Sequence, residues 1–192
     1  MIEKIQLPKS FFLGAAASAW QTEGWMGKKE GQDSQMDSWY KNEPHIWYDG
    51  YGPAVATNFI ERYKEDIAYM KEIGMNCYRT SLNWSRFLTD YENIVVDEEY
   101  ANYYDKMLDE LIAQGIEPMV CLEHYEIPAE LFKKYDGFAS KRVVELFVKY
   151  AQEAFSKRKP PNQGTYMGAE IAPQSGQCGT TTKTSECQRA GH

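Results

Sequence analysis

Four polar or half-polar side chains follow one another at residues 123–126, directly after an apolar run. They are Glu123, His124, Tyr125 and Glu126 of the stretch CLEHYEIPAEL. Imidazole, phenol and carboxylate groups exchange hydrogen bonds with a bound molecule and transfer protons when they gather in a pocket. A histidine in such a place can equally be a core residue with satisfied hydrogen bonds, so a site is indicated only if partners exist elsewhere in the chain.

Two other apolar runs, at residues 11–16 and 75–78, also end in planar polar groups mixed with aromatic rings. These groups are Trp20, Gln21, Glu23, Arg79, Asn83 and Trp84. Sugar hydroxyls need neutral donors and acceptors, and the C–H face of a pyranose ring packs on an aromatic ring. Each residue alone could be structural, but the recurrence at three run ends predicts a carbohydrate site.

Three amphipathic helices are predicted to position these residues. Asp97 and Ser140 are expected to cap the second and third helices, and Gly74 and Gly115 to end the first two. The residues expected to face inward are Phe59, Tyr63, Ile67, Met70 and Ile73; Tyr100, Tyr104, Met107, Leu111 and Ile112; and Val144, Phe147, Val148, Ala151 and Phe155.

Short apolar runs after Gly74 and Gly115 alternate with these helices, which predicts an α/β fold with parallel strands and crossover helices. In a (β/α)8 barrel, the carboxyl ends of all strands meet at one face, and that face holds the active site. About three βα units of such a TIM barrel are expected, and Gln21, Arg79 and His124 are expected to line one pocket.

The composition excludes several partners. A net charge of −7 argues against nucleic acid, and no apolar run of about 18 residues could cross a bilayer. No glycine-rich phosphate loop, GxSxG setting or metal-ligand spacing occurs, so we expect no cofactor and no metal. The spacing of Cys77, Cys121, Cys178 and Cys187 fits no disulfide framework, which favours a cytoplasmic protein. The sequence does not indicate an oligomeric state.

The composition changes near residue 156. Residues 157–192 contain only Tyr166, Met167 and Ile171 as large apolar groups, and they carry five basic against two acidic residues in an otherwise acidic chain. Such a segment cannot build a core. We therefore expect residues 1–156 to form a partial barrel and residues 157–192 to be a non-native or disordered tail. The tail is either an ordinary C-terminal extension or the product of a frameshift or truncation.

Three segments resemble, in order and spacing, the N-terminal part of family 1 glycoside hydrolases, and most closely the bacterial 6-phospho-β-glucosidases. They are FFLGAAASAWQTEG, RYKEDIAYMKEIGMNCYRTSLNWSRF and DELIAQGIEPMVCLEHYEIPAEL, within residues 8–156. The resemblance implies a (β/α)8 barrel and a retaining β-glycosidase acting on a β-glucoside or 6-phospho-β-glucoside. It further implies that Gln21, His124 and Tyr125 bind the sugar and that Arg79 supports the catalytic nucleophile.

The catalytic carboxylates themselves are not found. A retaining glycosidase needs two, about 5 to 5.5 Å apart. The family resemblance places the first in an Asn-Glu-Pro motif shortly after Phe155, where KRKPPNQG stands instead, and the second in a later Glu-Asn-Gly motif. We interpret Asn42-Glu43-Pro44, after the first strand, as coincidental. The chain is therefore expected to be an inactive fragment of a β-glycosidase; the alternative is a non-catalytic sugar-binding module.

Overall fold

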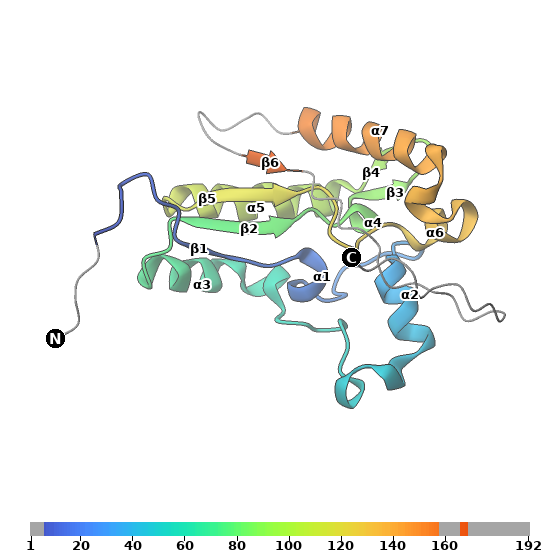
Figure 1. Cartoon of the computed structure of the whole chain (residues 1–192), viewed down its shortest axis with the longest axis horizontal. Helices are drawn as coiled ribbons and strands as arrows, with labels where there is room; N and C mark the ends of the chain where they lie inside the picture. The colour runs from blue at the N-terminus through green and yellow to red at the C-terminus, as the bar shows by residue number, and fades with distance from the viewer. Residues whose placement is uncertain (1–5, 158–165, 169–192) are drawn as a thin grey trace, which may run out of the picture.

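A single parallel sheet forms the centre of the computed structural model, which describes residues 6–157 and 166–168 (Figure 1). Its strands are β1 (Gly14–Ala16), β2 (Cys77–Ser81), β5 (Glu117–Cys121) and β6 (Tyr166–Gly168), in the order β1-β2-β5-β6. All three pairings are parallel. The sheet is open between β1 and β6, so the predicted α/β portion of a barrel is confirmed.

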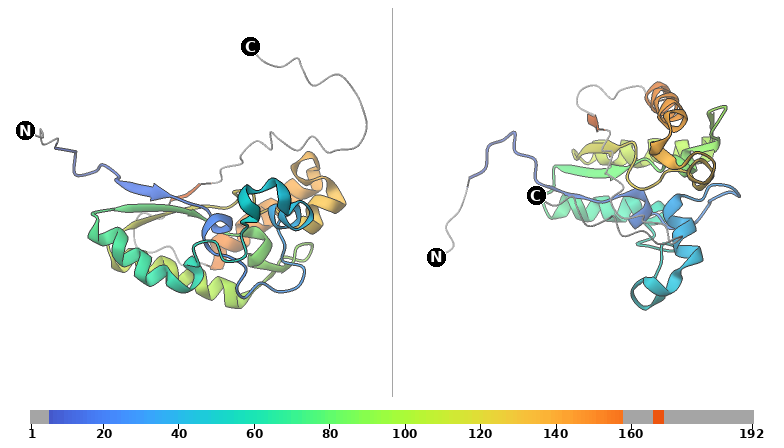
Figure 2. Two further views of the ribbon diagram at one scale, coloured as in Figure 1. Left: turned by 90° about the horizontal axis from the view of Figure 1, so that it is seen from below. Right: turned by 45° about the vertical axis from the view of Figure 1, so that its right-hand side comes forward.

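The longer helices cover one face of this sheet. They are α3 (Phe59–Glu72), α5 (Glu98–Ala113) and α7 (Lys141–Lys157), and Figure 2 shows α3 and α5 side by side. The shorter elements are α1 (Ala19–Thr22), α2 (Gln35–Asn42), η1 (Pro44–Ile46), η2 (Tyr48–Gly50), α4 (Trp84–Phe87), β3 (Leu88–Asp90), β4 (Val95–Val96), α6 (Ala129–Tyr135) and η3 (Gly137–Ala139). Most of these short elements lie beyond the carboxyl ends of the strands, where the site is expected.

The predicted boundaries of α3 and α5 are confirmed. Asp97 caps α5 by accepting hydrogen bonds from the backbone N–H groups of Glu99 and Tyr100, at 3.2 and 3.4 Å. Gly115 has φ +72°, a left-handed conformation that glycine adopts without steric cost, so the chain can leave α5 and enter β5. The α5 stripe is buried except for Ile112, which is 38% exposed.

The predicted inward face of α7 is partly wrong. Val144, Val148 and Phe155 are 46%, 49% and 51% exposed. The face that packs against the core instead consists of Val143, Leu146, Phe147, Tyr150 and Ala154. Tyr150 decides this rotation, because its ring stacks on the buried Trp84 at 5.2 Å and its hydroxyl reaches the carbonyls after β2 and β5. The sequence pattern favoured the more apolar stripe and overlooked that tyrosine.

Strand β6 lies in the segment that was expected to be a tail. Its register places Met119 beside Tyr166 and Cys121 beside Gly168, so it extends the parallel sheet next to β5. This strand was not among the sequence predictions. Residues 158–165 and 169–192, including Cys178 and Cys187, lie outside the described residues, and the character of the tail stays a prediction.

Asp97 gives a direct test of the capping interaction. Besides capping α5, its carboxylate accepts hydrogen bonds from Lys29 and Gln32, at 2.7 and 2.8 Å. We expect Asp97→Ala to lower the free energy of unfolding by about 1–2 kcal/mol, measured by urea denaturation. Asp109→Ala, an exposed position on the same helix, is the control and should change it by less than about 0.5 kcal/mol. Equal effects of the two substitutions would contradict the capping role.

Candidate functional site

Arg79, the central residue of β2, meets His124, which follows β5, although 45 residues separate them in the sequence. Nη2 of Arg79 lies 3.1 Å from Nδ1 of His124. Because a guanidinium can only donate, Nδ1 is the acceptor and the neutral ring carries its proton on Nε2. Arg79 also donates to Sγ of Cys121 at 2.9 Å and to the carbonyl of Ala17 at 3.2 Å. The guanidinium of Arg79 thus links β2 to the end of β1 and to the end of β5.

Tyr125 follows His124 in an unusual backbone conformation. Its φ is +71°, in the left-handed region that a residue with a β-carbon seldom adopts. The side chain is 39% exposed, and its ring lies 5.2 Å from the His124 ring at 79° between planes. The tyrosine therefore lies at the surface beside the histidine.

Gln21 lies on α1, the short helix that follows β1, and its side chain is exposed. It lines a cleft of about 240 Å³ together with Trp20, Trp47, Tyr51, Pro53 and Ala56. Gln21, Arg79 and His124 therefore belong to three neighbouring parallel strands or the turns after them. The lining of this cleft does not include Arg79 or His124, so the single pocket expected for all three residues stays a prediction.

A buried carboxyl group, that of Glu126, connects these three strand ends. Its Oε1 accepts hydrogen bonds from Oγ of Ser81 at 2.6 Å and from the backbone N–H of Trp20 at 3.3 Å. Its Oε2 accepts from the backbone N–H of His124 at 2.6 Å. Oγ of Ser81 in turn accepts from the backbone N–H of Ala19 at 2.8 Å. The side chain is completely buried, so Glu126 positions the segments that carry Gln21 and His124.

Burial also shifts the titration of the two glutamates in this stretch. Desolvation raises the pKa of Glu123 to about 7, although backbone N–H groups of residues 125–127 oppose the shift. Desolvation raises the pKa of Glu126 well above its usual range, and the neighbouring Glu123 adds to that effect. The polar cluster that interrupts the apolar run therefore includes two carboxyl groups that hold their protons more tightly than usual.

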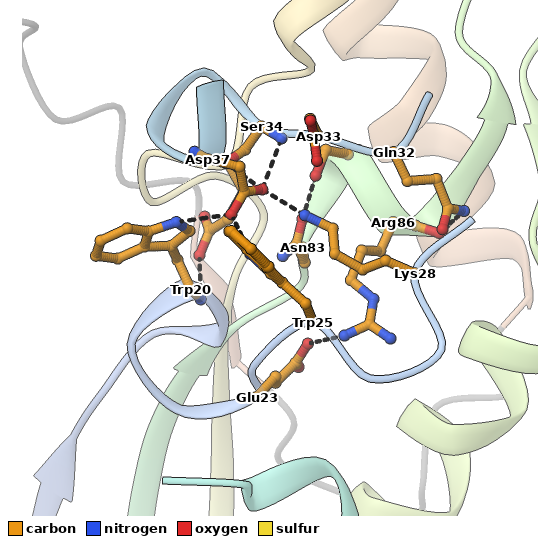
Figure 3. Close-up of polar contacts among 12 residues, drawn as sticks. Trp20, Glu23, Trp25, Lys28, Gln32, Asp33, Ser34, Asp37, Asn83 and Arg86 are labelled. Atoms are coloured by element: carbon orange, nitrogen blue, oxygen red, sulfur yellow. Dashed lines mark hydrogen bonds and ion pairs between the residues drawn. The ribbon is translucent and has the colours of Figure 1, made fainter. Parts of the chain in front are cut away.

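A second polar network lies next to α1, as Figure 3 shows. Asp37 accepts hydrogen bonds from the indole N–H groups of Trp20 and Trp25, at 3.2 and 2.6 Å, and pairs with Lys28. Burial alone would raise the pKa of Asp37, but the charge of Lys28 and hydrogen bonds from Lys28, the Ser34 backbone and Trp25 outweigh burial and lower the pKa. Since Trp20 precedes Gln21, this network fixes the turn that carries the predicted sugar ligand.

Two of the polar and aromatic residues noted at the strand ends have structural surroundings instead. Glu23 is buried, accepts a hydrogen bond from Tyr100 at 2.7 Å and pairs with Arg86 at 3.4 Å. Trp84 is fully buried in the core. Neither side chain is available to a ligand, because both are enclosed by the helices that cover the sheet.

Sequence reasoning missed the supporting residues Ser81 and Asp37. Asp37 had a detectable signal, because Ser34-x-x-Asp37 is a capping box at the start of α2, and both of its hydrogen bonds are present. Ser81 had none beyond its place at the end of a strand. Among residues 6–157 and 166–168, no group of three or more metal-ligating side chains occurs, and no helix is long and apolar enough to cross a membrane.

The raised pKa of Glu123 predicts a pH-dependent stability. Since this pKa is about 7 in the folded protein against an ordinary value of 4.5, the folded state binds the proton more tightly. Its contribution to stability is fully present below about pH 4.5 and is lost as the pH rises through about 7. Glu123→Gln, which is uncharged and similar in shape, should therefore stabilise the protein at pH 8 by about 2–3 kcal/mol and leave it little changed at pH 4.5.

The measurement is urea denaturation at both pH values. Glu130→Gln, at an exposed position of α6, is the matched control and should have little effect at either pH. A Glu123→Gln variant whose stability falls between pH 4.5 and 8 as steeply as that of the unchanged protein would contradict the assignment.

Comparison with known proteins places the chain in a family. The sequence model of glycosyl hydrolase family 1 matches residues 3–160. The chain is 39% identical over 153 residues to the 6-phospho-beta-glucosidase GmuD of Bacillus subtilis, covering 80% of this chain and 32% of that protein. It is 38% identical over 156 residues to beta-glucosidase 24 of Oryza sativa, covering 81% and 31%. The chain thus spans about a third of the length of these relatives.

Solved structures agree with the sequence match. A family 1 beta-glucosidase from the fungus Humicola insolens, solved in complex with glucose, superposes with a TM-score of 0.72 at 35% identity, covering 80% of this chain and 32% of that one. An aphid myrosinase gives 0.73 at 25% identity, covering 80% and 33%. Because the family match spans most of the chain, including the strand ends that carry Gln21, Arg79 and His124, the chain belongs to glycosyl hydrolase family 1.

Proposed function

We propose that these strand ends form part of the sugar site of a retaining β-glycosidase that acts on 6-phospho-β-glucosides. The contact of 3.1 Å between Arg79 and His124 carries this proposal, because it sets an arginine and a neutral imidazole together at the carboxyl ends of parallel strands. Family membership and the relatives named as beta-glucosidases and 6-phospho-beta-glucosidases support it. The cysteine spacing keeps the cytoplasm as the proposed compartment.

Each site residue has a chemical role in this proposal. The amide of Gln21 and the imidazole of His124 exchange hydrogen bonds with sugar hydroxyls, and the ring of Tyr125 forms a wall beside them. Arg79 supports the catalytic nucleophile, because a nearby guanidinium lowers the pKa of a carboxylate and keeps it ionised. Glu126 acts through the others, since it holds the backbone of His124 and of Trp20 in place.

We further propose that the 192-residue chain does not itself hydrolyse glucosides. Retaining hydrolysis needs a nucleophile and an acid/base residue at matched positions, and neither expected motif occurs in its place. Glu43, of the single Asn-Glu-Pro string, follows α2 directly and accepts a hydrogen bond from Trp39 at 2.8 Å. The hydrogen bond to Trp39 and the exposed position indicate a structural role for Glu43.

The purified chain should therefore release no 4-nitrophenol from 4-nitrophenyl β-glucoside or from its 6-phosphate. Its binding of methyl β-glucoside and of the 6-phosphorylated sugar is measured in parallel by calorimetry. Turnover that survives further purification and is abolished by Arg79→Ala would refute the proposed inactivity.

A chimera tests the proposed roles in catalysis. Residues 1–156 are joined to the C-terminal remainder of the Bacillus subtilis relative, and the product should hydrolyse 6-phospho-β-glucosides with retention, followed by NMR of the released anomer. Gln21→Ala and His124→Ala should each lower kcat/KM on the order of 10²-fold, and Arg79→Ala should lower it further. Lys64→Ala, exposed on α3, is the control. Normal kinetics in all three site variants of an active chimera would show that the assignment is wrong.

A further inference from the structure

A cavity of about 220 Å³ lies between the sheet and the helices that cover it. The sheet contributes Leu82, directly after β2, and Val120 of β5, while Leu108 of α5 and Ala154 of α7 close the opposite side. No residue of the proposed sugar site is among the described residues that line this cavity. The function proposed above therefore does not explain it.

The cavity stays open because small side chains face it and its aromatic wall is anchored. Ala101 of α5 and Ala154 of α7 each present a single methyl group, which leaves space between the two helices. Phe87 of α4 forms another wall, and its ring packs edge-on against that of Tyr150 at 5.7 Å between centroids. The Tyr150 hydroxyl in turn reaches the carbonyls after β2 and β5, at 3.2 and 2.9 Å. A wall held in this way resists moving inward to fill the space.

The interior of this cavity is apolar. Its large apolar lining residues are at most 4% exposed; they are Leu82, Phe87, Leu108 and Val120. The polar lining residues stand on one stripe of α5 at the solvent side, where two are exposed and one is half-buried; they are Glu98, Asn102 and Asp105. A water molecule inside would need two to four polar partners, and a charged group would lose its hydration without compensation.

We infer that this cavity is a binding site for a small, uncharged apolar molecule, about the size of one aromatic ring with a short alkyl arm. An apolar cavity of about 150 Å³ is large enough to hold benzene. The volume of about 220 Å³ here therefore admits a substituted ring. Such a molecule would contact the sheet, α5 and α7 together, and its binding should stabilise the packing of these helices on the sheet.

The test is a titration of the full chain with ethylbenzene, followed by ¹³C NMR of the methyl groups. The signals of Leu82, Leu108 and Val120 should shift in a saturable way. The signal of Leu131, which is buried in α6 and does not line the cavity, should stay and reports that the chain is folded. Benzoate, which is similar in size but charged, should bind at least about tenfold more weakly, because the apolar lining leaves a buried carboxylate without partners.

Variants that fill the cavity give an independent measurement. Ala154→Phe places a ring in the space, so it should weaken ethylbenzene binding by at least about tenfold and leave the urea midpoint unchanged or raised. Ala113→Phe, the same substitution at an exposed position of α5 outside the cavity, is the control and should bind ethylbenzene as the unchanged chain does. If Ala154→Phe does not fold, Ala101→Leu fills the space from α5 and takes its place.

Three results would overturn the inference. Ethylbenzene that leaves the three methyl signals unchanged would show that the side chains close the space in solution. Undiminished binding by a folded variant with a filled cavity would place the ligand elsewhere, and benzoate that binds as tightly as ethylbenzene would refute the class of ligand. No sugar is used in these measurements, so this inference and the proposed function can fail independently.

Discussion

The three strand ends depend on one buried carboxyl group. Glu126 has no exposed surface, yet its two oxygens accept hydrogen bonds from the turn after β1, the end of β2 and the turn after β5. A buried polar group is costly unless it is hydrogen-bonded, so this side chain strongly favours the arrangement in which all three donors converge. Parallel strands exchange hydrogen bonds along their length, but nothing in the sheet ladder fixes the loops beyond their ends. Glu126 supplies that constraint.

A second set of buried charged groups restricts the conformation of the turn that follows β1. Asp37 accepts hydrogen bonds from the indoles of Trp20 and Trp25 and pairs with Lys28 next to α1. Arg86 pairs with Glu23 and lies 4.6 Å from the Tyr100 ring centre. Removing one partner of a buried pair leaves an uncompensated charge, so such networks tolerate few alternative loop conformations. The turn that carries Gln21 is thereby held from both sides, and the cleft that Gln21 lines gains a fixed wall.

This arrangement also separates the residues proposed to contact a ligand from those that hold them. Tyr125 and Gln21 are exposed, whereas Glu126, Ser81 and Asp37 are buried. Arg79, proposed to support the nucleophile, also holds the site together, because its guanidinium bonds to the carbonyl of Ala17 and to Cys121 as well as to His124. A guanidinium can do this because it carries five donors in one rigid plane.

The sequence by itself determined the parallel α/β organisation, the ends of α3 and α5, and the convergence of Arg79 and His124. These follow from local signals, namely apolar periodicity, the cap at Asp97 and the stop at Gly115, together with the rule that parallel strands end on one face. Tertiary structure alone decided the rest. The rotation of α7 depends on Tyr150 stacking on Trp84, and the role of Glu126 depends on donors at Ser81 and Trp20, which are 45 and 106 residues away. Burial and partners so distant in the sequence leave no local pattern, because they exist only once the strands lie side by side.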